Sequence, residues 1–136
     1  MDLDVLFVGT AGSAPTARRG LPATLVRRGG DRLLFDCGEG TQRQLVRSTG
    51  LVELEEIFIT HFHADHVLGL PGMLKTFALR QRERPLTIYG PHSLPALFRT
   101  LRRGIRPGRS RRRRAAAEIF GGRCRALGPS ARPWRC

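Results

Sequence analysis

The chain has 136 residues, 40% of them hydrophobic, which suits one domain of ordinary size with a buried core. No apolar stretch approaches the ~20 residues of a membrane-spanning helix, and the acidic N-terminus is not a secretory signal. We therefore expect a cytoplasmic protein with no membrane partner. The net charge of +13 is unevenly divided: residues 1–101 carry 12 basic against 10 acidic side chains, and residues 102–136 carry 12 arginines against one acid. Three irregularly spaced cysteines predict no disulfide framework.

Three short apolar segments in the first third of the chain predict strands over residues 4–9, 23–27 and 32–36. Gly29-Gly30-Asp31 separates the last two segments and predicts a hairpin turn. The sheet is therefore expected to begin antiparallel. Cys37 follows the third strand directly, and we expect it to be a small buried thiol and not a metal ligand.

The end of the third strand leads into a predicted helix. Gly38 and Gly40 flank an acid there, and glycines allow the backbone to pass close to another group. Thr41 is expected to cap a helix over residues 42–49, and Gly50 is expected to end it.

The densest cluster of histidine and acidic side chains in the chain follows a short buried strand predicted over residues 57–59. His61 and His63 are two residues apart, so in an extended segment their side chains leave on the same side and can reach one ion. Asp65 and His66 lie where the chain turns and can aim at a second position. Imidazole nitrogens and carboxylate oxygens are ordinary zinc ligands, and the cluster therefore predicts a metal site.

The segment after the cluster alternates helix and strand. Residues 67–72 predict a tight turn into a helix over residues 73–82, and residues 86–90 predict another strand. Ser93 is expected to cap a helix over residues 94–103. This alternation predicts an α/β layered sheet.

Three strings carry a family resemblance: VGTAGSAPTARRGLPA at 8–23, FDCGEGTQRQL at 35–45 and THFHADHVLGLPG at 60–72. Together, in this order, they resemble ribonuclease Z, the metallo-β-lactamase-superfamily endonuclease that matures the 3′ end of transfer RNA. The resemblance implies the N-terminal half of an αββα sandwich, a mixed sheet with helices. It also implies a precursor tRNA substrate, two Zn²⁺ ions per active site with Mn²⁺ as an alternative, and a homodimer.

The resemblance also implies residue roles. His61 and His63 would hold one zinc, and Asp65 and His66 the other, with Asp65 also accepting a proton. Asp36 would lie behind the metal loop and orient the histidines. A metal-bound hydroxide would attack the phosphorus after the discriminator nucleotide. No substrate-binding residue is predicted.

The family's later ligands, two histidines and a bridging aspartate, have no counterpart in the sequence. Only His92 follows His66 among the histidines, and we expect it to be a loop residue outside the site; no aspartate follows Asp65. We therefore expect a truncated, inactive form of the enzyme, with a first domain over residues 1–103.

Residues 104–136 are rich in Arg, Gly and Pro, and we expect a mostly disordered basic tail. Our first hypothesis is that this tail is translated out of frame. An RNA-binding arginine segment and a solvated charge run without function are the rival interpretations.

Two other function classes stay open at this point. One is a different hydrolase of the superfamily, thioesterase-like or arylsulfatase-like, acting on a small molecule. The other is a non-catalytic RNA-binding fragment.

Overall fold

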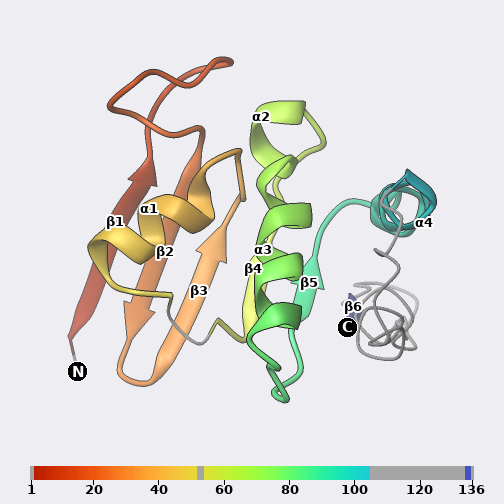
Figure 1. Ribbon diagram of the computed structural model, residues 1–136. Coiled ribbons are helices and arrows are strands. Elements are labelled where there is room, and N and C mark those ends of the chain that lie inside the picture. The colour runs from red at the N-terminus through yellow and green to blue at the C-terminus, as the bar shows by residue number, and fades with distance from the viewer. Residues whose placement is uncertain (1, 52–53, 105–133, 136) are drawn as a thin grey trace.

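The structure is a computed structural model that describes residues 2–51, 54–104 and 134–135. These residues form one mixed sheet in the order β1-β2-β3-β4-β5-β6, with helices α1 and α3 side by side over one face (Figure 1). The strands are β1 (Leu3–Gly9), β2 (Ala23–Arg28), β3 (Asp31–Phe35), β4 (Glu56–Phe58), β5 (Thr87–Tyr89) and β6 (Trp134–Arg135). The helices are α1 (Thr41–Ser48), α2 (Ala64–Val67), α3 (Gly69–Leu79) and α4 (Leu94–Gly104).

The sheet changes direction in its middle. β1, β2 and β3 pair antiparallel, as the hairpin at Gly29-Gly30 predicts, whereas β3, β4 and β5 pair parallel. Parallel neighbours need a crossover connection. Helix α1 supplies the crossover between β3 and β4, and α2 with α3 supplies the one between β4 and β5. The predicted mixed sheet with helices is confirmed.

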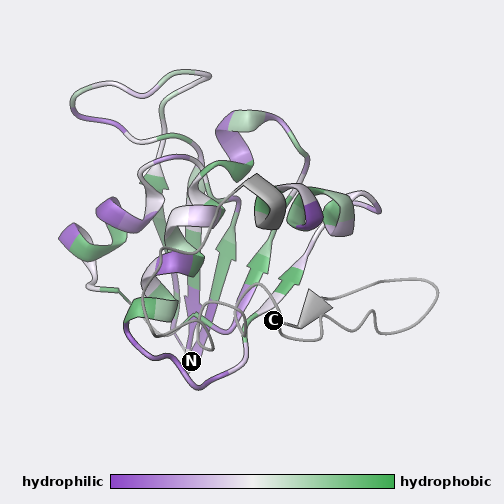
Figure 2. Cartoon of the chain, turned by 45° about the vertical axis from the view of Figure 1, so that its right-hand side comes forward, coloured by the Kyte–Doolittle hydropathy of each residue, from purple (hydrophilic) through white to green (hydrophobic). Residues whose placement is uncertain are grey.

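One row of side chains crosses the centre of the helix-covered face. Leu25 pairs with Leu34, Leu34 with Ile57, and Ile57 with Ile88, and all four are fully buried. The helices complete this core with further buried side chains: Leu45, Leu70, Met73, Leu74, Phe77 and Leu94. Figure 2 shows the same pattern, because the central strands are coloured mostly as hydrophobic. Burial of this apolar face is the main stabilising contribution to the fold.

The opposite face of the sheet is also apolar, but α1 and α3 do not cover it. Phe35, Phe58 and Tyr89 form a stacked ladder across three strands, with ring centroids 5.0 and 4.6 Å apart. On β1, Leu3 and Phe7 are 66% and 69% exposed. Among the described residues, this face is therefore an open apolar surface.

The segment after the histidine cluster differs from the prediction. Residues 67–72, expected to form a turn, lie almost wholly in α2 and α3, and α3 ends at Leu79, three residues before the predicted end. Pro71 is compatible with this because proline is tolerated in the first helical turn. The helix ends where Gln81 adopts a left-handed φ of 54°.

Thr41 does not cap α1. It is the first residue of the helix, and Gly40 occupies the cap position with a φ of 85°. The Thr41 hydroxyl instead donates back to the Gly38 carbonyl oxygen at 2.7 Å. Gly50 follows the helix with a φ of 76°, as expected for a terminating glycine.

The C-terminal segment was predicted to be mostly disordered from residue 104. Helix α4 extends to Gly104, and Trp134–Arg135 pair antiparallel with β5. An edge strand offers unpaired backbone groups, and a two-residue pairing of this kind has no side-chain pattern to predict it. Residues 105–133, and with them most of the predicted tail, lie outside the described residues. None of the described helices is long and apolar enough to cross a membrane.

Candidate metal centre

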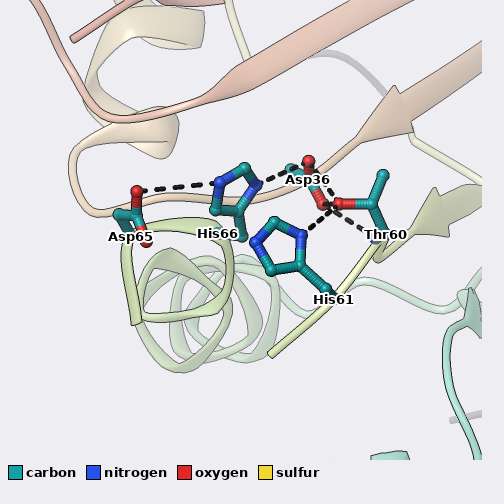
Figure 3. A network of polar contacts seen from close by, with 5 residues as sticks. All are labelled: Asp36, Thr60, His61, Asp65 and His66. Carbon is teal, nitrogen blue, oxygen red and sulfur yellow. Dashed lines mark hydrogen bonds and ion pairs between the residues drawn. The ribbon is translucent and has the colours of Figure 1, made fainter. Parts of the chain in front are cut away.

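The histidine cluster lies at the carboxyl ends of two neighbouring parallel strands. Asp36 follows β3 directly, and its backbone N–H donates to the Phe58 carbonyl oxygen at 2.8 Å. Thr60 and His61 follow β4. In an open α/β sheet the carboxyl ends of the strands are the usual place for a site, and Figure 3 shows Asp36, Thr60 and His61 close together there.

Backbone contacts fix the segment after β3 against the segment of α2. The Cys37 N–H donates to the His66 carbonyl oxygen, and the Gly69 N–H donates to the Cys37 carbonyl oxygen, both at 2.8 Å. A Cβ on Gly38 would lie 2.3 Å from the Asp65 carbonyl oxygen, so only glycine fits. The close backbone approach expected at this glycine is confirmed, and its neighbour is the segment that carries Asp65 and His66.

Asp36 is the polar centre of the cluster. It is 8% exposed and holds a left-handed φ of 59°, a conformation uncommon for residues other than glycine. Its Oδ1 accepts the Thr60 N–H at 2.9 Å, and its Oδ2 lies 2.8 Å from Nδ1 of His66. Asp36 therefore contacts one predicted ligand, His66, and the backbone of Thr60.

The three imidazoles are close to one another. The rings of His61 and His63 are 4.6 Å apart edge to face, and those of His61 and His66 are 4.0 Å apart. Nε2 of His66 faces Oδ2 of Asp65 at 3.6 Å. The structure thus brings all four predicted ligands to one end of the sheet, and places His61 near His66 as well as near His63.

The donor set determines whether these residues fit a metal ion. As a carboxylate, Asp36 can only accept, so His66 presents Nδ1–H to it and keeps a lone pair on Nε2. That lone pair faces the Asp65 carboxylate, and a cation between two such acceptors is favourable. The pair fits a zinc-type ion. Among the described residues, however, no three His, Cys, Asp or Glu side chains gather around one point.

Cys37 confirms the predicted buried thiol. It is fully buried, and burial raises the pKa of its thiol to about 12, with the Thr41 side chain opposing the effect and the charge of Asp36 adding to it. The thiolate is the metal-binding form of cysteine. The thiol is therefore neutral at ordinary pH.

Thr60 has a part that the sequence did not reveal. Its hydroxyl contacts both Asp36 and His61. The sequence offered one signal for this contact, because Thr60 is a hydroxyl-bearing residue between the end of β4 and the first histidine of the cluster. His92 is exposed in the turn between β5 and α4.

Comparison with known proteins identifies relatives that match most of this chain. The family model described as "Anti-Pycsar protein Apyc1" matches residues 3–119. The ribonuclease Z of Natronomonas pharaonis is 52% identical over 101 residues, which cover 74% of this chain and 33% of that protein. The ribonuclease Z of Gemmatimonas aurantiaca is 48% identical over 111 residues, covering 82% of this chain and 34% of that protein.

Solved structures with similar folds also superpose on this chain. The crystal structure of human tRNase Z, short form, superposes with a TM-score of 0.66 at 44% identity, covering 74% of this chain and 40% of that one. The metallo-beta-lactamase fold protein YhfI of Bacillus subtilis superposes with a TM-score of 0.62 at 25% identity, covering 74% of this chain and 41% of that one. The chain spans about a third of the length of the curated relatives it matches.

Proposed function

The chain belongs to the family described as Anti-Pycsar protein Apyc1, its N-terminal part is a ribonuclease Z-like metallo-β-lactamase fold, and on this premise we propose that its histidine cluster serves the endonucleolytic removal of the 3′ trailer of precursor tRNA. The substrate follows from the relatives named ribonuclease Z and tRNase Z. The reaction class is phosphodiester hydrolysis.

One observation carries the proposal. Asp36, buried and 2.8 Å from Nδ1 of His66, holds that imidazole with Nε2 toward Asp65. A metal-binding histidine ordinarily donates its other N–H to a carboxylate in this way. A histidine cluster on a protein surface without a ligand function does not need such a buried partner.

The residues have separate roles in the proposed reaction. His61 and His63 hold one cation, and Asp65 and His66 hold the other. A bound divalent cation supplies Lewis-acid chemistry for the hydrolysis of the phosphodiester. Asp65, 18% exposed at its side chain, would also accept a proton at a carboxylate oxygen. Asp36 keeps His66 in the tautomer that leaves Nε2 available.

We propose zinc as the cation, since imidazole with carboxylate is a zinc-type donor set, and Mn²⁺ is the second candidate. The expected homodimer and cytoplasmic location stay predictions. Light scattering of the purified chain measures the first, and fractionation of cells that express it measures the second.

A chimera tests the function directly. The matched 101 residues of this chain replace their counterpart in the Natronomonas pharaonis ribonuclease Z, and the chimera is assayed for 3′ cleavage of a precursor tRNA with zinc or manganese. We expect cleavage at the correct position, and loss of cleavage with Asp65→Ala.

The control is His92→Ala in the same chimera, which removes a histidine outside the cluster and should leave cleavage unchanged. A folded chimera that hydrolyses thioesters or aryl esters but not precursor tRNA would contradict the proposed substrate and favour a different hydrolase of the superfamily.

A further inference from the structure

The Thr60 hydroxyl bridges the buried carboxylate and the first histidine of the cluster. Its Oγ1 lies 2.9 Å from Oδ1 and 3.0 Å from Oδ2 of Asp36, and 2.9 Å from Nδ1 of His61 (Figure 3). Asp36 therefore reaches two imidazoles, His66 directly and His61 through one hydroxyl.

The direction of each hydrogen bond follows from the groups involved. A carboxylate offers no proton, so the Thr60 O–H must donate to Asp36. The hydroxyl has no second proton and can only accept from His61. His61 must then carry its proton on Nδ1, which leaves the lone pair on Nε2.

We propose that Thr60 is a positioning residue that, with Asp36, fixes His61 in the Nδ1–H tautomer and so presents Nε2 to the metal. One buried carboxylate thereby sets the tautomer of a ligand in each of the two donor pairs, His61 with His63 and His66 with Asp65. This role rests on the proposed metal-dependent function for its purpose, whereas the tautomer measurement that tests it does not.

The backbone of Thr60 takes part separately, which makes a clean substitution available. The Thr60 N–H donates to Oδ1 of Asp36 and stays in place when only the side chain changes. Thr60→Val replaces the hydroxyl with a methyl group of similar size at an exposed position. Thr60→Ser keeps the hydroxyl.

The experiment measures tautomers in the metal-free full chain. ¹⁵N chemical shifts of the imidazole nitrogens are recorded in mildly alkaline buffer. We expect Nδ1–H for both His61 and His66 in the parent chain and in Thr60→Ser. Thr60→Val should lose the Nδ1–H preference at His61 and keep it at His66.

Zinc affinity, measured by competition with a chelator, is the second readout. Loss of a partner behind a ligand typically weakens metal binding about 10–100-fold, and we expect Thr60→Val in that range with Thr60→Ser near the parent. Thr100→Val is the matched control, because the Thr100 hydroxyl bonds only within α4, to the Ala96 carbonyl oxygen.

An unchanged His61 tautomer in folded Thr60→Val overturns the proposal, as does an equal change at His66, because of these two imidazoles the hydroxyl contacts only that of His61. Unaltered zinc affinity in Thr60→Val overturns it too. Absence of tRNA cleavage in the chimera leaves the tautomer result standing, so the two failures are distinguishable.

Discussion

Nδ1 of His66 lies 2.8 Å from Oδ2 of Asp36, although the two residues are thirty positions apart in the sequence, with α1 and β4 between them. The contact forms because β3 and β4 are parallel neighbours whose carboxyl ends meet at one edge of the sheet. The orientation of a candidate metal ligand is thus determined by the topology of the sheet and not by the histidine motif alone.

Asp36→Asn should weaken zinc binding about 10–100-fold. The amide keeps one oxygen for the Thr60 N–H, but an NH₂ group facing Nδ1 of His66 forces the imidazole to move its proton to Nε2, which faces Asp65. Asparagine also tolerates the left-handed φ of this position, so the chain should stay folded. Chelator competition measures the change, and parental affinity would contradict the orienting role.

Gly38→Ala should destabilise the chain, because the new Cβ would lie 2.3 Å from the Asp65 carbonyl oxygen and 2.5 Å from Cβ of Leu21. Overpacking of this kind typically costs about 1–3 kcal/mol. Gly12→Ala is the matched control, since nothing lies within 4 Å of a Cβ there. Urea denaturation of the two variants gives the comparison, and equal midpoints would show that the backbone approach is not tight.

Cys37 should resist alkylation in the folded chain. Burial raises the pKa of its thiol to about 12, so almost no thiolate exists near neutral pH. Peptide-level mass spectrometry after iodoacetamide treatment should find Cys37 unmodified until denaturant is added. Modification at the rate of a free thiol under native conditions would contradict this burial.

The same pKa predicts a pH dependence of stability. The pKa of the thiol in the folded chain, about 12, is above the ordinary 9.0. The contribution of the neutral Cys37 thiol to the free energy of unfolding is therefore fully present below about pH 9 and is lost as the pH rises toward 12. The stability difference between the parent and Cys37→Ala should therefore shrink across this window. A constant difference would mean that the thiol does not stay protonated in the fold.

Local patterns predicted the parts of the site that depend on neighbours in sequence. A strand followed by H-x-H-x-D-H identified His61, His63, Asp65 and His66 because the motif and its frame lie within ten residues. Asp36 was predicted only through the family resemblance, since its contact with His66 spans thirty residues.

The features that the sequence did not predict also depend on contacts between residues distant in sequence. Thr60 drew no attention because its role depends on Asp36, a distant partner. The helical path of residues 67–72 was missed because Gly69, Pro71 and Gly72 favour a turn locally. Tertiary contact overrides that preference: the Gly69 N–H bonds to Cys37, and a Cβ at Gly69 would meet the Gly38 carbonyl oxygen at 2.1 Å.

The open apolar face of the sheet predicts low solubility of the isolated chain. Leu3 and Phe7 are 66% and 69% exposed on the same face of the sheet as the Phe35–Phe58–Tyr89 ladder, and exposed apolar patches promote association. We expect strong binding of the dye ANS and low solubility. Leu3→Lys with Phe7→Lys should reduce both, whereas Leu79→Lys, on α3, should have less effect. A monomer with a sharp thermal transition and no dye binding would count against this.

The last prediction concerns catalysis by the 136-residue chain itself. Catalytic zinc typically keeps three protein ligands and a water. The described residues provide two donor pairs and no group of three around one point. The chain should therefore bind zinc weakly and cleave precursor tRNA far more slowly than an intact relative. Cleavage is assayed with added zinc or manganese, and Asp65→Ala serves as the blank.

A contrary result would be informative in a specific way. If the purified chain cleaves at the correct 3′ position and Asp65→Ala abolishes the activity, the cluster must be completed by donors outside the described residues of one chain. Dilution of the active chain then separates two sources. Activity per chain that falls on dilution indicates that a second copy contributes ligands, and activity per chain that stays constant indicates that one chain holds the full set.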